Sequence, residues 1–232
     1  MPRVLLVYYS YTQQSRRVAD VMAELFRERG FEVQLAAIEF TDTRYAQPFS
    51  RLPLRHAYRD VFRMLVPQLR RATGEIRVPD VALQGHYDLV CIGSPTWWLT
   101  TNMPIRSFLK SDAASVLLAG SRFAAFVVCR RYWRNNLRTV KKLGTKQGGD
   151  WLEGIHFAFA GGQIRSFLAL VSYLASGEIR ERYLKVKIPP TNLEPGYDEA
   201  ARRFAGRLAD RHDAQERARA DAQPTAIGRA AS

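Results

Sequence analysis

Short apolar runs that alternate with an amphipathic helical pattern are the feature that most limits the folds open to this chain. Residues 3–9 form an apolar run rich in β-branched and aromatic side chains, as in a strand buried on both faces. Similar runs span 33–38, 89–93, 123–129 and 155–160. Residues 13–29, between the first two runs, repeat apolar side chains at helical spacing. Parallel strands need such a crossover, so the pattern predicts a doubly wound α/β fold around a five-stranded parallel sheet.

The length of the chain favours one domain that carries additions. A chain of 232 residues is long enough for one sizeable core with insertions. We expect a helical insertion at about 41–85, because 54–72 is amphipathic, although Pro67 interrupts it. Further helices are expected at 104–109, with Asn102 as cap, at 132–143, ended by Gly144, and at 199–209. The domain is then 1–211, and 212–232, which lacks periodicity, is predicted to be a disordered tail.

Apolar runs and cysteine usage exclude several classes of protein. The longest apolar run, 164–175, contains Arg165 and is shorter than the roughly 20 residues that a membrane-spanning helix needs. The first ten residues enter a strand pattern without a signal peptide. We therefore expect a cytoplasmic protein with no transmembrane segment. Cys91 and Cys129 lie in apolar runs, which predicts buried, reduced thiols and no disulfide or metal site.

The charge of the chain is strongly positive. The net charge of +13 favours anionic partners, but the sign alone does not choose among them. Residues 122–146 contain eight basic residues and no acidic residue. We interpret 134–146 as a solvated basic face. No recognition motif or aromatic platform accompanies these charges, so no nucleic-acid partner is expected.

Hydroxyl and amide side chains follow the first strand and lead directly into a helix. The first amides of a helix lack partners and carry the positive end of its dipole, so such a turn can bind a phosphate. An ordinary polar helix cap would show the same local pattern. The candidate phosphate-binding residues are Ser10, Tyr11, Thr12, Gln13, Gln14 and Ser15.

In this segment the chain resembles the flavodoxin family, whose first loop reads hydroxyl-x-hydroxyl-Gly-Asn/Gln-hydroxyl. Ser10, Thr12, Gln14 and Ser15 match this pattern, and Gln13 stands where the family has glycine. A glycine can be needed there for close approach or a positive φ. Unless φ must be positive, the amide of Gln13 can still donate. The resemblance extends over about 3–161 and implies strand order 2-1-3-4-5 and FMN as cofactor.

A second matching segment ends the third strand with the sequence Gly-Ser-Pro-Thr-Trp-Trp. It is similar to the family's isoalloxazine-binding loop. In an open α/β sheet the loops after the first, third and fourth strands meet at one crevice. We expect Pro95, Thr96, Trp97 and Trp98 to border the flavin ring with amides and aromatic faces. The alternative places the tryptophans in the core or in an interface.

A third segment, 129–136, follows the fourth strand. Its Cys-Arg-x-x-Trp pattern, with Gly161, Gly162, Gln163 and 173–177, resembles a narrower group, the dialkylresorcinol-condensing enzymes. This resemblance implies oxidation of a cyclic diketone that becomes an aromatic ring. Cys129 and Arg130 are expected at the cofactor, and Arg130 and Tyr132 as catalytic residues. Arg130 or Arg131 could pair with an anionic substrate oxygen, a nicotinamide cofactor phosphate or the reduced flavin anion.

Three functional hypotheses follow. The favoured one is an FMN-dependent oxidoreductase for a small lipophilic cyclic diketone or quinone-like substrate, with NAD(P)H as an optional reductant. In that enzyme the insertion and 164–175 would roof the flavin crevice. The second hypothesis is a flavodoxin-type electron carrier, against which the positive charge and the added segments argue. The third is a flavin-free module that binds a phosphate or an acidic acyl carrier protein. Oligomeric state is undecided, and a homo-oligomer is compatible with the sequence.

Overall fold

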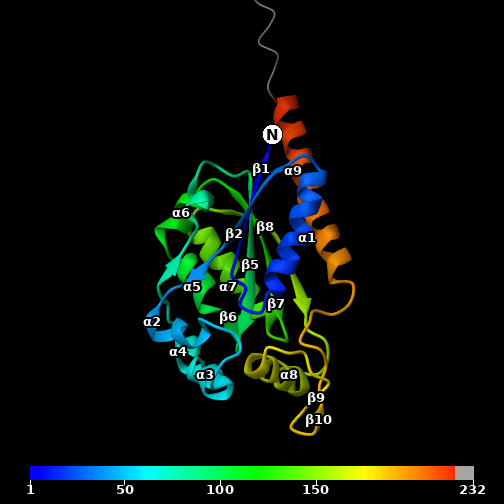
Figure 1. The fold of residues 1–232 in the computed structure, drawn as a ribbon. Coiled ribbons are helices and arrows are strands. Elements are labelled where there is room, and N and C mark those ends of the chain that lie inside the picture. The colour runs from blue at the N-terminus through cyan, green and yellow to red at the C-terminus, as the bar shows by residue number, and fades with distance from the viewer. Residues whose placement is uncertain (223–232) are drawn as a thin grey trace, which may run out of the picture.

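The computed structural model describes residues 1–222 and has the expected α/β architecture (Figure 1). The five main strands are all parallel to their neighbours and lie in the order β2-β1-β5-β7-β8, which is the predicted order 2-1-3-4-5. A short strand, β6 (Thr100–Thr101), pairs antiparallel with the end of β5. The main strands are β1 (Arg3–Tyr8), β2 (Glu32–Ala37), β5 (Leu89–Trp97), β7 (Arg122–Cys129) and β8 (Asp150–Ala158).

Helices cover both faces of the sheet because each central strand is apolar on both sides. In β1, Val4 and Leu6 face the core shared with α1 (Gln14–Glu28) and α9 (Tyr197–Ala222), whereas Leu5 and Val7 face the opposite core. All four side chains are fully buried. The second core is completed by α5 (Met103–Phe108), α6 (Asp112–Leu118) and α7 (Trp133–Lys146).

The predicted insertion and α8 (Gln163–Ser176) lie together at the carboxyl ends of the strands (Figure 1). Leu54 and Ala57 of the insertion share a small buried cluster with Val171 and Leu174 of α8. The amide of Leu54 also donates to the carbonyl of Leu174 at 2.6 Å. We call this assembly the cap. The insertion consists of β3 (Glu39–Phe40), α2 (Thr43–Ala46), a 3₁₀ turn (Gln47–Phe49), α3 (Ala57–Arg63), α4 (Leu65–Leu69), β4 (Ile76–Arg77) and a second 3₁₀ turn (Asp80–Leu83).

Two predictions about helix ends are wrong. The tail that was expected to be disordered from residue 212 is helical as far as Ala222, the end of α9, and 223–232 lie outside the described residues. His212 anchors this extension, since it is buried with its ring 5.1 Å from that of Phe31. Gly144 does not end α7, which continues to Lys146. A Cβ at Gly144 would lie 2.5 Å from the Phe123 ring, so this glycine permits close helix–sheet packing.

Two strands are longer than predicted. β8 begins at Asp150 rather than near 155, and β5 continues to Trp97 rather than ending at Gly93. The first part of β8 was not predicted because it contains polar residues, whereas the strands were identified from apolar runs. Asp150 nevertheless pairs in parallel register with Arg122. Among residues 1–222, no helix combines the length and the apolar character that crossing a membrane requires.

Candidate functional site

Three loops at the carboxyl edge of the sheet carry the residues that the sequence singled out. They follow β1, β5 and β7, which are adjacent, because β5 pairs with β1 on one side and with β7 on the other. Tyr8 at the end of β1 is opposite Gly93, and Val128 near the end of β7 is opposite Pro95. The loop after β1 is bounded by Tyr8 and Gln14, and the loop after β7 by Cys129 and Trp133.

The loop after β1 presents unpaired backbone donors. Within residues 1–222 the four consecutive amides from Thr12 to Ser15 have no hydrogen-bond acceptor. The amide of Arg16 donates to Ser10 Oγ at 3.2 Å, and the first regular helical bond runs from Arg17 to the carbonyl of Gln13 at 3.1 Å. The first turn of α1 contains no acidic side chain. Free amides at a helix start without a competing carboxylate form an anion-binding arrangement.

Gln13 adopts the backbone conformation that a glycine would reach more easily. Its φ is 61° and its ψ is 2°, in the left-handed region. Position 13 therefore has the positive φ for which a glycine was expected to be needed. For a residue with a side chain this conformation costs roughly 1–2 kcal/mol. The side chain is exposed, and its Nε2 donates to the carbonyl of Ser10 at 3.3 Å, so the loop keeps its shape without glycine.

Gln14 and Ser15 turn inward at the start of α1. Both are buried, and Gln14 Nε2 donates to the carbonyl of Thr12 at 3.3 Å and to Asn192 Oδ1 at 3.4 Å. Gln14 Oε1 is shielded from solvent and has no donor within the described chain. Asn192, which sequence reasoning missed, also accepts from Arg17 Nη1 at 3.3 Å. No local pattern around Asn192 could have revealed a contact across 178 residues.

The predicted loop 95–98 is part of β5 as far as Trp97, and a buried polar network holds this carboxyl end of the strand. Asn136 Oδ1 accepts from Ser94 Oγ at 2.9 Å, and its Nδ2 donates to Thr96 Oγ1 at 2.9 Å. Asn102 caps α5, as predicted, by accepting from the amide of Ile105, and it also donates to the carbonyl of Pro95 at 2.8 Å. Asn136 was missed, because it lies in a segment that charge alone identified as a solvated face. This network fixes Pro95 and Thr96 at the carboxyl edge.

The two adjacent tryptophans point into different aromatic groups, and neither is fully buried. The Trp97 ring stacks on Phe49 with centroids 6.1 Å apart and meets Tyr9 edge-on at 5.6 Å. Trp98 has a positive φ of 55°, and its ring lies 5.2 Å from that of Phe62. Trp97 and Trp98 therefore connect the carboxyl end of β5 to the cap, in addition to bordering the carboxyl edge of the sheet.

The loop after β7 contains a shielded cation without an acidic partner. The Arg130 guanidinium lies 4.3 Å above the Phe159 ring, and its Nε donates to the carbonyl of Ser166 at 3.1 Å. Although part of the Arg130 side chain reaches solvent, Nη2 is shielded and has no hydrogen-bond partner within residues 1–222. Desolvation by burial lowers the pKa of Arg130 to about 10. A partly shielded cation that lacks an acidic partner can attract an anion.

The other two candidates in this loop differ in environment. Cys129 is buried, and burial raises its thiol pKa to about 12, which leaves it protonated and unreactive. Both cysteines are free and buried, as predicted. Tyr132 is exposed and precedes α7 with a left-handed φ of 61°. No described contact joins Tyr132 to Arg130.

A cavity of about 710 Å³ lies beside the loop after β1, on its β2 side. Of the predicted cofactor residues, it includes Ser10, Tyr11 and Gln13, and the insertion forms the opposite wall. Tyr11 Oη donates to the carbonyl of Arg51 at 2.8 Å, which ties the two walls together. Burial raises the pKa of Tyr11 to about 12, so its phenol stays neutral. The tryptophan loop and Arg130 do not line this cavity.

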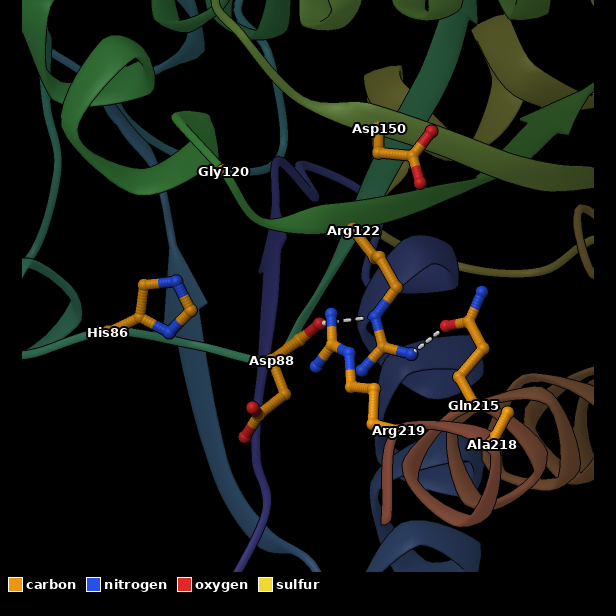
Figure 2. A pocket seen from close by; sticks show the side chains of 8 residues that line it. All are labelled: His86, Asp88, Gly120, Arg122, Asp150, Gln215, Ala218 and Arg219. Atoms are coloured by element: carbon orange, nitrogen blue, oxygen red, sulfur yellow. Dashed lines mark hydrogen bonds between the residues drawn. The ribbon is translucent and has the colours of Figure 1, made fainter. Parts of the chain in front are cut away.

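A second cavity, of about 480 Å³, opens at the other edge of the sheet (Figure 2). Arg122 and Asp150, the first residues of β7 and β8, line it together with α9. The Arg122 guanidinium points toward the Asp88 carbonyl and the Gln215 side chain, and it donates to both (Figure 2). Ligands of open α/β sheets bind at the carboxyl ends of the strands, so we place the candidate functional site at the carboxyl ends of β1, β5 and β7 and not at this second cavity. Residues 1–222 contain no cluster of metal-ligating side chains.

Comparison with known proteins supports the fold. No family model matches the chain, and no curated protein matches its sequence. A flavoprotein from Lactobacillus acidophilus, solved in complex with FMN, is 16% identical with a TM-score of 0.51, over 67% of this chain and 93% of that one. An archaeal flavodoxin is 10% identical with a TM-score of 0.48, over 91% and 99% of the two chains. Flavodoxin 1 from Bacillus cereus is 14% identical with a TM-score of 0.47, over 88% and 95%. The strand order and the likeness to the Lactobacillus acidophilus flavoprotein show that the chain has the flavodoxin-like fold.

Proposed function

We propose that the protein is an FMN-dependent oxidoreductase that acts on a lipophilic cyclic diketone or quinone-like substrate. The observation that carries the proposal is the run of four free amides from Thr12 to Ser15 at the start of α1. The structural neighbour from Lactobacillus acidophilus, whose structure contains FMN, supports the choice of cofactor. A cytoplasmic location and NAD(P)H as reductant belong to the same proposal.

The residues present fit the chemistry of FMN. Amide and hydroxyl donors of Ser10 and residues 12–15 would hold the phosphate. The unpaired Gln14 Oε1 can accept a hydrogen bond from a ribityl hydroxyl. The loop 95–98 would border the ring, whose chemistry is the transfer of hydride equivalents. FMN would thus find donors, an acceptor and aromatic surface on neighbouring segments of the carboxyl edge.

Arg130 is our candidate for the residue that acts on the substrate. A cyclic diketone that loses a proton before it gives up hydride to the flavin would pass through an enolate, whose oxygen carries negative charge. The shielded guanidinium, which lacks a carboxylate partner, would stabilise that charge. Tyr132 is exposed in the same loop after β7, and its phenol would donate or accept a proton. The cap would keep water from the reacting atoms.

The cap also favours an enzyme over a simple electron carrier. A carrier needs an exposed flavin edge, whereas the insertion and α8 pack on each other at the carboxyl edge. The loop keeps free amides although Gln13 replaces the glycine, and this argues against a flavin-free module. An aromatising step in dialkylresorcinol-type synthesis is the specific reaction that we propose.

Titration of the purified protein with FMN and with riboflavin tests the proposal. We expect FMN to bind with a shift in its visible spectrum and riboflavin, which lacks the phosphate, to bind at least about tenfold more weakly. Thr12→Pro, which removes one free amide, should weaken FMN without changing riboflavin. Equal affinities for the two flavins, or no binding of either, would refute the phosphate site. Oxidation of a cyclic 1,3-diketone by the FMN-loaded protein then distinguishes the enzyme from a carrier.

A further inference from the structure

The tip of the hairpin formed by β9 (Arg182–Tyr183) and β10 (Val186–Lys187) is an unusual surface feature. The hairpin reaches beyond α8 at the lower end of the molecule (Figure 1). Its two-residue turn is Leu184-Lys185, with φ values of 49° and 64°. Two-residue hairpins of this geometry favour Asn-Gly, because both central residues need a positive φ. A leucine and a lysine therefore hold strained positions that other residues would occupy more easily.

Apolar side chains around this tip are exposed. Leu184 has 68% of its surface exposed and Ile179 has 53%. The Tyr183 ring stacks on Tyr58 of α3, with centroids 6.4 Å apart, which joins the hairpin to the insertion. On the same helix Phe62 is 49% exposed. Exposed apolar side chains on the hairpin and on α3, which the stacked tyrosines join, are typical of a surface that binds a partner or a membrane.

Basic residues surround these apolar groups. Between 179 and 187 there are four basic residues and one acidic residue. Arg180 pairs with Glu178, and within residues 1–222 Arg182, Lys185 and Lys187 have no ion pair. On α3, Arg63 is likewise exposed and unpaired within the described chain. Unpaired cations that alternate with exposed apolar side chains complement a surface with anionic head groups above an apolar layer.

We propose that the hairpin tip and the adjacent face of α3 dock the protein on an anionic lipid bilayer. Leu184 would enter the boundary between head groups and acyl chains, while Arg182, Lys185 and Lys187 contact lipid phosphates. A projecting two-residue turn lacks the broad face, about 800 Å² per partner, of a stable protein interface. This docking goes beyond the proposed redox function and does not depend on FMN. It would bring the carboxyl edge, where the candidate site lies, next to the membrane.

Sedimentation with lipid vesicles tests the proposal on the full chain without FMN. We expect binding to vesicles of equal parts phosphatidylglycerol and phosphatidylcholine, and none to phosphatidylcholine alone. L184N/K185G replaces the tip with the residues that its turn prefers, so the melting temperature should stay or rise while the partition coefficient falls at least about tenfold. R182Q/K187Q, which keeps the apolar tip, should also weaken binding about tenfold.

Two matched controls remove equivalent groups elsewhere. V116N takes away an exposed apolar side chain on α6, and K142Q/K146Q removes two charges near the end of α7. Both controls should bind vesicles like the wild type. The proposal is overturned if the wild type ignores anionic vesicles, if the tip variants bind as well as it does, or if it binds an acidic protein such as an acyl carrier protein instead of vesicles. Loss of FMN binding would leave these results unchanged, so the two proposals fail separately.

Discussion

At the scale of single residues, the site depends on a few side chains in conformations or surroundings that cost free energy. Gln13 is left-handed where glycine would be relaxed, and Arg130 is a shielded cation without a carboxylate. Such costs persist only where the surrounding structure compensates for them, and they concentrate at functional sites. These two residues therefore give the sharpest tests of the candidate site.

Gln13→Gly should stabilise the protein. Glycine reaches a positive φ without a Cβ penalty, so we expect the free energy of unfolding to rise by about 1 kcal/mol in urea titrations. FMN affinity should stay equal or increase. Arg71→Gly is the matched control, because Arg71 also has a positive φ, 56°, but lies in the insertion. It should give a similar gain in stability and leave FMN affinity unchanged. A loss of stability in the Gln13 variant would contradict the left-handed assignment.

Arg130→Met should separate function from folding. Methionine fills similar space without a buried charge, so the free energy of unfolding should stay within about 1 kcal/mol of the wild type or exceed it. In contrast, kcat with a cyclic diketone should fall about 100-fold, with a smaller change in KM. Arg131→Met, a change at an exposed neighbour that donates to Gln163, should alter neither quantity. A loss of several kcal/mol in the Arg130 variant would instead assign this residue a structural role.

At the scale of elements, apolar periodicity identified all five strands, the family resemblance supplied their order, and both ends of α1 lie within one residue of the expected limits. The errors come from contacts that sequence spacing does not encode. Gly144 is internal to a helix because Phe123 packs on it, and α9 is long because His212 meets Phe31. The candidate phosphate loop was predicted from local chemistry, whereas Asn136 and Asn192 act through contacts 40 and 178 residues away.

The insertion is fastened at both ends by one buried carboxylate. Asp42 accepts from the amide of Glu75 at 3.1 Å and pairs with Arg44 at 2.7 Å, and hydrogen bonding to Arg44 lowers the pKa of Asp42 to about 2. Because its folded pKa lies below its ordinary value, Asp42 stabilises the insertion above about pH 4, and this contribution disappears as the pH falls toward 2.

Asp42→Asn should therefore destabilise the insertion at neutral pH. It should also make the stability of the insertion less dependent on pH, because the titrating carboxylate is gone. Limited proteolysis between pH 7 and pH 3 measures both effects, as cleavage within residues 43–72. Asp80→Asn, at an exposed carboxylate of the same insertion, should behave like the wild type. Equal cleavage of the wild type and the Asp42 variant at pH 7 would show that this carboxylate does not hold the insertion.

At the scale of the whole molecule, the protein combines a large core with a thin cap. Two apolar cores cover the faces of the sheet, whereas the cluster that joins the insertion to α8 has four buried residues. Regions with few buried apolar contacts open at lower free energy than the core around them. The cap should therefore open and close over the carboxyl edge while the sheet stays folded, which gives a lipophilic substrate a route from a membrane to the candidate site.

Leu174→Ala tests this division of stability. Leu174 is buried in the cap cluster, so its truncation should destabilise the cap by about 2–5 kcal/mol and speed amide hydrogen exchange in α3 and α8. Exchange in β5 and β7 should not change, because these strands exchange through opening of the whole sheet. Leu118→Ala, a truncation of equal size in the main core, should accelerate exchange in the strands and lower the melting temperature. If Leu174→Ala accelerated hydrogen exchange in β5 and β7 as much as in α3 and α8, the cap and the sheet would unfold as one unit. The substrate would then need a route to the candidate site that does not require the cap to open.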